Sequence, residues 1–167
     1  KPQDLFVVLK LAVSRNAPHS FSGLAMALSM SASEVHAAFR RATLCHLIES
    51  EDGAPVVNRA ALQEFMFHGV RYVFPALTGP VTRGVPTGAF APVLRAHFEQ
   101  ADTMPMVWPD PEGEVRGTAI LPLYPTVPYA SRIDPKLYDA LSLLDALRGG
   151  AAREREMARG LLMGLML

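Results

Sequence analysis

The sequence has a single cysteine among its 167 residues, at position 45. One thiol can form neither an intramolecular disulfide nor a multi-cysteine zinc site, so no such cross-link is expected in this fold. A chain without disulfides is typical of a reducing compartment, and we predict a cytoplasmic protein. Cys45 follows Leu44 at the expected end of a helix, where the pattern predicts a small buried side chain rather than a thiol nucleophile.

The chain also lacks long apolar runs and an excess of either charge. No hydrophobic stretch reaches the roughly 18 residues needed to span a bilayer. The first four residues, Lys1 to Asp4, are polar rather than signal-like, so we expect no membrane association. Sixteen basic residues balance sixteen acidic ones, which argues against a surface that attracts nucleic acid or anionic lipid everywhere. Any binding to a polyanion must come from a local patch.

Motifs for catalysis are missing as well. Residues 82–88 superficially resemble a phosphate-binding loop, but the G-x-x-x-x-G-K-[ST] pattern is absent and no lysine lies near. Cys45, His46 and His68 do not have the spacing of a metal site, and there is no G-x-S-x-G nucleophile elbow. We therefore expect no catalytic residue, metal or cofactor, and predict that the protein is not an enzyme.

What the chain does have is hydrophobic residues and proline. Half of the residues are hydrophobic, enough to bury the core of one domain or two small ones. Ten of the fourteen prolines lie between Pro75 and Pro128, together with five glycines, so this stretch cannot hold long helices. It should be an ordered extended segment laid over a surface, and residues 105–117 predict two strands joined by an Asp-Pro-Glu-Gly turn.

Helices and one hairpin are predicted before the proline-rich stretch. Apolar residues at helical spacing predict a first helix from Gln3 to Ser14, which Asn16 and Pro18 should stop. Ser20 or Ser22 should cap a short second helix, and the chain then breaks at residues 29–31. Ser31 and Glu34 have the S-x-x-E spacing of a capping box, which begins a third helix.

The third helix has one apolar stripe and one polar face. The residues expected to point inward are Val35, Ala38, Phe39 and Ala42. Those pointing elsewhere are Ser33, His36, Ala37, Arg40 and Arg41. Residues 49–57 then predict two short strands around an Asp-Gly turn, and Asn58 can cap a fourth helix from Arg59 to about Tyr72.

Three helices with a short break before the third, followed by a small hairpin, resemble the winged helix-turn-helix domain of bacterial transcription regulators. The resemblance covers residues 3–58. It rests on a small residue of the second helix, Ala25, an apolar anchor ten residues later, Val35, and a Leu-Ile pair at 47–48 that enters the wing. Leu24, Leu28 and Met30 fill the other apolar positions. The turn usually has a glycine where this sequence has Ser29.

The resemblance implies a sequence-specific transcription regulator that binds double-stranded DNA as a homodimer. The residues facing base edges would be Ser33, His36, Ala37 and Arg40, and those contacting phosphates would be Lys10, Arg15, Arg41 and Arg59. Arg can bond a guanine edge twice, and a small residue permits close approach. Charge is the objection: residues 1–60 contain six basic and five acidic residues, and the wing tip, with Glu49, Glu51 and Asp52, should not lie on a phosphate backbone.

Helices that could form a dimer are predicted at the end of the chain. Asp134 and Pro135 begin a helix that residues 149–150 end; its apolar stripe is Leu137, Leu141, Leu144 and Leu147. Residues 151–167 predict a last helix with a strongly apolar end, which must fold back on its own core or pack on a second copy. The homodimer is the preferred interpretation. The fourth helix is apolar nearly all round from Phe65 and must be covered on several sides.

The predicted fold is therefore mainly α: a winged helix-turn-helix domain with a linker helix (1–74), then a proline-rich extended region with C-terminal dimerisation helices (75–167). A second interpretation is an interaction module, antitoxin-like or a scaffold, that grips a partner protein with the winged helix and residues 75–128. A third is a small-molecule-sensing regulator with a pocket between the fourth helix and the C-terminal helices.

Overall fold

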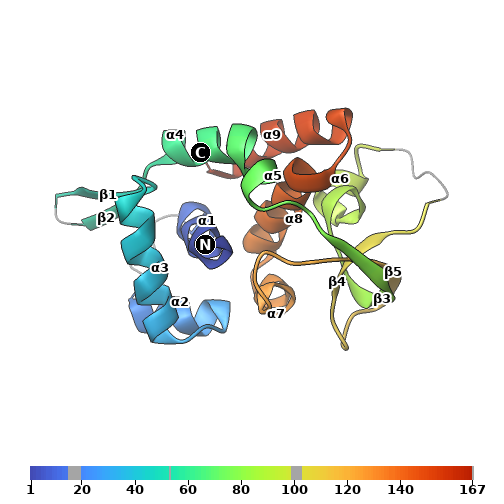
Figure 1. Ribbon diagram of the computed structural model, residues 1–167, viewed down its shortest axis with the longest axis horizontal. Coiled ribbons are helices and arrows are strands. Elements are labelled where there is room, and N and C mark those ends of the chain that lie inside the picture. The colour runs from blue at the N-terminus through green and yellow to red at the C-terminus, as the bar shows by residue number, and fades with distance from the viewer. Residues whose placement is uncertain (15–19, 53, 99–102, 167) are drawn as a thin grey trace.

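The computed structural model describes residues 1–14, 20–52, 54–98 and 103–166. It is mainly helical with a small sheet and a separate hairpin, as the sequence predicts (Figure 1). The first half contains α1 (Pro2–Val13), α2 (Phe21–Leu28), α3 (Ala32–Leu44), β1 (Ile48–Glu51), β2 (Ala54–Val57), α4 (Arg59–Glu64), the π-helical turn η1 (Phe65–Gly69) and α5 (Val70–Val73). The second half contains β3 (Thr78–Pro86), the 3-10 turn η2 (Gly88–Phe90), α6 (Pro92–Arg95), β4 (Met106–Pro109), β5 (Val115–Ile120), α7 (Val127–Ile133), α8 (Pro135–Gly149) and α9 (Ala152–Met166).

The centre of the molecule is α8, which contacts α1, α5, α6, α7 and α9. As predicted, Asp134 caps it, its side chain accepting a hydrogen bond from the backbone N–H of Leu137 at 3.1 Å. The leucine stripe of α8 is almost completely buried within the single chain. This corrects the expectation that α8 forms a dimer, because neighbouring helices of its own chain already cover its apolar face.

The last helix, α9, folds back on the same core. Ala158, Leu162 and Met166 are at most 1% exposed, and α9 lies along α8. The apolar end of the chain thus has its cover without a second copy, which was the less favoured of the two expectations; Leu167 itself lies outside the described residues. No helix in the described ranges is long and apolar enough to cross a bilayer.

The proline-rich region builds a small closed sheet at the end of the molecule opposite α3 (Figure 1). The two strands predicted there are β4 and β5, and both pair antiparallel with β3 while pairing parallel with each other. Such tight closure needs glycine, because a Cβ on Gly84 would lie 2.0 Å from the carbonyl oxygen of Trp108. The prolines and glycines of β3 concealed this strand from sequence analysis.

A buried polar cluster fastens this region to α8. The carboxylate of Asp145 accepts hydrogen bonds from the Thr87 hydroxyl at 2.8 Å and the Trp108 indole N–H at 2.6 Å. It also pairs with Arg148 at 2.6 Å, and both of these side chains are 3% exposed. Arg148 in turn donates to the backbone carbonyl of Phe74 at 2.7 Å. Every strong donor of the cluster therefore meets an acceptor inside the protein.

The predicted fourth helix is present, but its path and cover differ from expectation. The helix continues from Arg59 to Val73 through the π turn η1. Met66 and Val70 are buried, whereas Tyr72 is 76% exposed and Val73 56% exposed. The described part of this single chain thus covers the apolar end of the helix only partly.

Candidate nucleic-acid interface

The turn between α2 and α3 adopts the conformation that usually requires glycine. Ser29 has φ 50° and ψ 48°, in the left-handed region, and the backbone N–H of Met30 donates to the carbonyl of Ala25 at 2.9 Å. A residue with a Cβ pays roughly 1 kcal/mol or more for this conformation. Ser29 therefore adopts the conformation of the glycine that usually stands in this turn, and it sets how α3 leaves α2.

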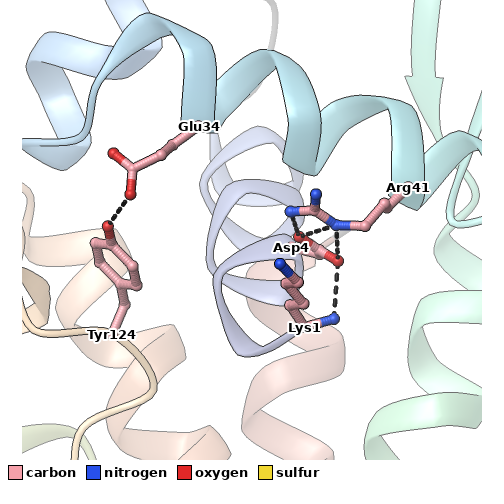
Figure 2. Close-up of polar contacts among 5 residues, drawn as sticks. All are labelled: Lys1, Asp4, Glu34, Arg41 and Tyr124. Atoms are coloured by element: carbon pink, nitrogen blue, oxygen red, sulfur yellow. Dashed lines mark hydrogen bonds and ion pairs between the residues drawn. The ribbon is translucent and has the colours of Figure 1, made fainter.

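The beginning of α3 is fixed by the predicted capping box and by a tyrosine from the second half of the chain. The backbone N–H of Glu34 donates to the Ser31 hydroxyl at 3.2 Å, and the Ser31 N–H donates to the Glu34 carboxylate at 3.0 Å. The other carboxylate oxygen accepts from the hydroxyl of Tyr124 at 2.7 Å (Figure 2). Hydrogen bonds from Tyr124 and Ser31 lower the pKa of Glu34. The hydrogen bond between Tyr124 and Glu34 also raises the pKa of Tyr124.

The other end of α3 is held on α1 by a forked ion pair. The Arg41 Nε donates to both oxygens of Asp4, at 3.1 and 2.9 Å, and a terminal nitrogen donates at 2.6 Å (Figure 2). Burial raises the pKa of Asp4, but the hydrogen bonds from Arg41 and from the backbone amino group of Lys1 outweigh it, so the pKa lies below its ordinary value. Because Arg41 is engaged with Asp4, it orients α3 and is not a free phosphate contact.

The inward face of α3 matches the prediction. Val35, Ala38 and Ala42 are at most 1% exposed. Phe39 is half-buried and meets the ring of Phe21 edge-on, with centroids 5.3 Å apart. The helix is therefore anchored on one side by small and branched side chains that let it approach α1 and α2 closely.

The opposite face of α3 brings the predicted base-reading residues together. Ser33, His36 and Arg40 are exposed and Ala37 is half-buried. The His36 ring lies edge-on to Phe21 at 5.1 Å, which restricts its rotation. Arg40 makes no hydrogen bond or ion pair within the described part of the chain. Its guanidinium is available to a ligand.

Lys10 and Arg59, two of the other predicted phosphate contacts, are engaged within the chain. Lys10 forms an ion pair with Asp134 at 2.6 Å and its side chain is 13% exposed. Arg59 donates to the backbone carbonyls of Ala12 and Met166, which ties α4 to α1 and α9. Arg15 lies outside the described residues, as do Asn16 and Pro18. Since Asp134 is 124 residues away from Lys10, no local sequence pattern could have revealed that pairing.

The predicted hairpin follows α3 and is acidic. β1 and β2 pair antiparallel with Glu51 opposite Ala54, and Asp52 has φ 51°, as a tight two-residue turn requires; Gly53 lies outside the described residues. Glu49 and Glu51 are exposed, and Glu49 accepts a hydrogen bond from the Asn58 side chain at 2.7 Å. The described hairpin thus offers carboxylates and no cation to a polyanion.

Cys45 is exposed, which corrects the prediction of a buried small residue. The helix ends at Leu44, and the chain turns at His46, which has φ 58°. Cys45 therefore leaves the helical face on which Ala38 and Ala42 are buried, although its sequence spacing continues that face.

Comparison with known proteins gives no match: no protein-family model, curated protein or solved structure is significantly similar to this chain. A functional argument for it must therefore start from the geometry around α3 and from the cavities of the fold.

Proposed function

We propose that the protein binds double-stranded DNA with the exposed face of α3 and acts as a sequence-specific transcription regulator. The observation that carries this proposal is the pairing of a buried apolar stripe on α3 with an exposed face that holds Ser33, His36 and the unpartnered Arg40. The order of three helices and a hairpin, as in the winged helix-turn-helix regulators that residues 3–58 resemble, supports it.

The chemistry of this face suits the major groove. A helix fits into the groove, and an arginine there can donate two hydrogen bonds to a guanine edge. Ser33 in the first turn can donate to a base or phosphate, and Ala37 leaves room for close approach. The Tyr124–Glu34 hydrogen bond and the bidentate Arg41–Asp4 ion pair hold both ends of α3 to the body of the protein, so the face is presented rigidly.

Tight binding would require more than one copy of the chain. A single free arginine on α3 neutralises little phosphate charge, and affinity for DNA rises steeply with the number of neutralised phosphates. We therefore propose a homodimer. Because α8 and α9 are used in the core, the dimer contact would involve exposed apolar residues such as Tyr72, Val73 and Leu77, of which the last two are each 56% exposed.

The test is selection of bound sequences from a random duplex pool, followed by fluorescence anisotropy of the selected duplex at several salt concentrations. Arg40→Ala should weaken specific binding by about 1–3 kcal/mol, the worth of one bidentate base contact. Arg40→Lys keeps the positive charge but cannot form the two parallel hydrogen bonds of a guanidinium. The variant should therefore retain the salt dependence of binding and lose discrimination between bases. Arg116→Ala, which removes an exposed arginine of β5 at the opposite end of the molecule, is the matched control.

Absence of saturable DNA binding by the wild-type protein at low salt would refute the proposal. Equal losses in the Arg40→Ala and Arg116→Ala variants would also refute it, because they would indicate attraction by overall charge rather than recognition by α3.

The second candidate is a module that binds a partner protein. The acidic hairpin and the internal engagement of Lys10, Arg41 and Arg59 favour it, as does the exposed apolar segment at Tyr72 and Val73. This candidate predicts no DNA binding by the wild type. It also predicts a stoichiometric complex with a protein partner that Val73→Asp abolishes, while the substitution leaves the thermal unfolding of the free chain unchanged.

A further inference from the structure

A polar cavity lies between the fourth helical segment and the C-terminal helices. Its volume is about 190 Å³. The walls come from η1 and α5 on one side and from α8 and α9 on the other, and the lining residues are Phe67, His68, Arg71, Tyr72, Leu147, Arg155 and Arg159. None of these residues belongs to the exposed face of α3.

The ionisable side chains that line this cavity are mainly basic. Three arginines and a histidine line it, and no carboxylate does. Arg155 and Arg159 are one helical turn apart on α9, a spacing at which like charges repel. Among the described residues, the one ion pair formed by these arginines joins Arg159 to Glu156 at 3.8 Å, and the Glu156 side chain is 80% exposed. The positive charge is therefore left largely uncompensated.

The arginines are positioned by contacts that do not neutralise them. Arg155 donates to the backbone carbonyl of Gly150 at 2.6 Å, and Arg159 donates to that of Phe67 at 3.0 Å. Arg71 contacts the ring of Tyr72, 5.3 Å from its centroid. The Nε of Arg159 is buried without a hydrogen-bond partner among the described residues. A buried N–H without an acceptor is unfavourable, so this Nε favours the entry of an acceptor such as an anion.

The backbone at this wall is also unusual. Residues Phe65–Gly69 form a π turn, a conformation that is rare and often occurs at functional sites. Gly69 ends this turn next to the ring of Phe65, and a Cβ there would lie 3.0 Å from that ring, so a larger residue would require the ring to shift. The irregular turn carries His68 and leads directly to Arg71, so it shapes one side of the cavity.

We propose that this cavity binds a small molecule bearing a phosphate-type oxyanion. Guanidinium forks match the geometry of phosphate oxygens, and several arginines together can bind the charge of a phosphate monoester. The volume is below the roughly 300 Å³ at which drug-sized pockets begin, so the site fits a phosphate with a few attached atoms. Phe67 and Tyr72 provide apolar contact for that attached group.

The test is isothermal titration of the full chain with inorganic phosphate and, in parallel, with glycerol 3-phosphate, at constant ionic strength set with sodium chloride. One saturable site is expected. Arg71→Gln should lower the affinity at least about tenfold, as expected for loss of a charge-assisted contact. Arg71 is exposed and makes no hydrogen bond or ion pair with the described residues, only a cation–π contact with Tyr72, so this substitution should not affect folding. Arg116→Gln on β5 is the control and should bind as the wild type does.

The outcomes separate the possible sources of the oxyanion. Tighter binding of glycerol 3-phosphate supports an organic phosphate as the ligand, and equal binding supports the free anion. No saturable heat at millimolar phosphate, or equal losses in the Arg71→Gln and Arg116→Gln variants, overturns the proposal. So does a result in which Arg71→Gln weakens binding to duplex DNA and neither small phosphate binds, because the arginines would then contact a DNA backbone. The titration contains no DNA, so failure of the α3 proposal leaves it valid.

Discussion

The buried pair of Asp145 and Arg148 should be the strongest single polar determinant of stability. Replacing Asp145 by alanine removes an acceptor of three hydrogen bonds and leaves a guanidinium that is 3% exposed without its counter-charge. Breaking a buried pair on one side costs about 3–5 kcal/mol. The unsatisfied Thr87 and Trp108 donors add about 1 kcal/mol or more each, so the total approaches the 5–15 kcal/mol that stabilises a typical domain.

A double-mutant cycle makes this prediction measurable even if the alanine variant unfolds. Asp145→Asn keeps the shape and one acceptor oxygen and should cost less than Asp145→Ala. Arg148→Met combined with Asp145→Asn removes both charges, and the double variant should be more stable than the sum of the single effects by about 2–3 kcal/mol.

The assay is urea unfolding followed by the fluorescence of Trp108, the single tryptophan of the chain, whose indole N–H bonds Asp145. Its environment should change on unfolding, so the transition reports directly on this cluster. A cost below 1 kcal/mol for Asp145→Ala, or strict additivity in the cycle, would refute the argument that the pair's charges are coupled and desolvated.

Two further predictions concern the ends of α3. The folded-state pKa of Asp4 lies below its ordinary value of 3.8, so its carboxylate stabilises the fold above that pH, and the stabilisation is lost as the pH falls through the folded-state pKa. Asp4→Asn should therefore lower the free energy of unfolding at neutral pH by about 1 kcal/mol and flatten the acid side of the stability curve. Urea unfolding measured from neutral to acidic pH checks this, and an unchanged acid side of the curve would contradict it. Tyr124→Phe removes the donor that most lowers the pKa of Glu34, so the Glu34 pKa measured by carboxyl NMR should rise, while Tyr129→Phe at a 48% exposed position should leave it unchanged.

The sequence was sufficient to predict helix starts and the inward face of α3. Ser31 with Glu34, Asn58 and Asp134 each cap the helix that their spacing predicted, because capping depends on residues within one turn. The apolar stripe from Val35 to Ala42 could be predicted in the same way, because it depends on spacing within one helix. The strand β3 was missed because its prolines and glycines oppose the usual strand signal, and it is held by pairing with two later strands.

The two candidate binding sites, the exposed face of α3 and the arginine-lined cavity, depend more on the tertiary structure than the helix caps do. Sequence analysis identified the exposed residues of α3, but it gave Arg41 a phosphate contact, because no local pattern shows that Asp4 of α1 pairs with it. It suggested a pocket between the fourth helix and the C-terminal helices, yet the arginines that line the described cavity come from positions 71, 155 and 159. No pattern in the chain links them.

What the sequence alone determined was therefore the helical class, the caps, the hairpin and the buried stripe of α3, since each depends on hydrogen bonds or spacing within a few residues. The tertiary structure decided which charges remain available for binding. Lys10, Arg41 and Arg59 are engaged by partners on other elements, whereas Arg40 and the cavity arginines keep uncompensated charge. The physical reason is that an ion pair or a desolvated cation is defined by its neighbours in space, and those neighbours lie up to 124 residues away along the chain.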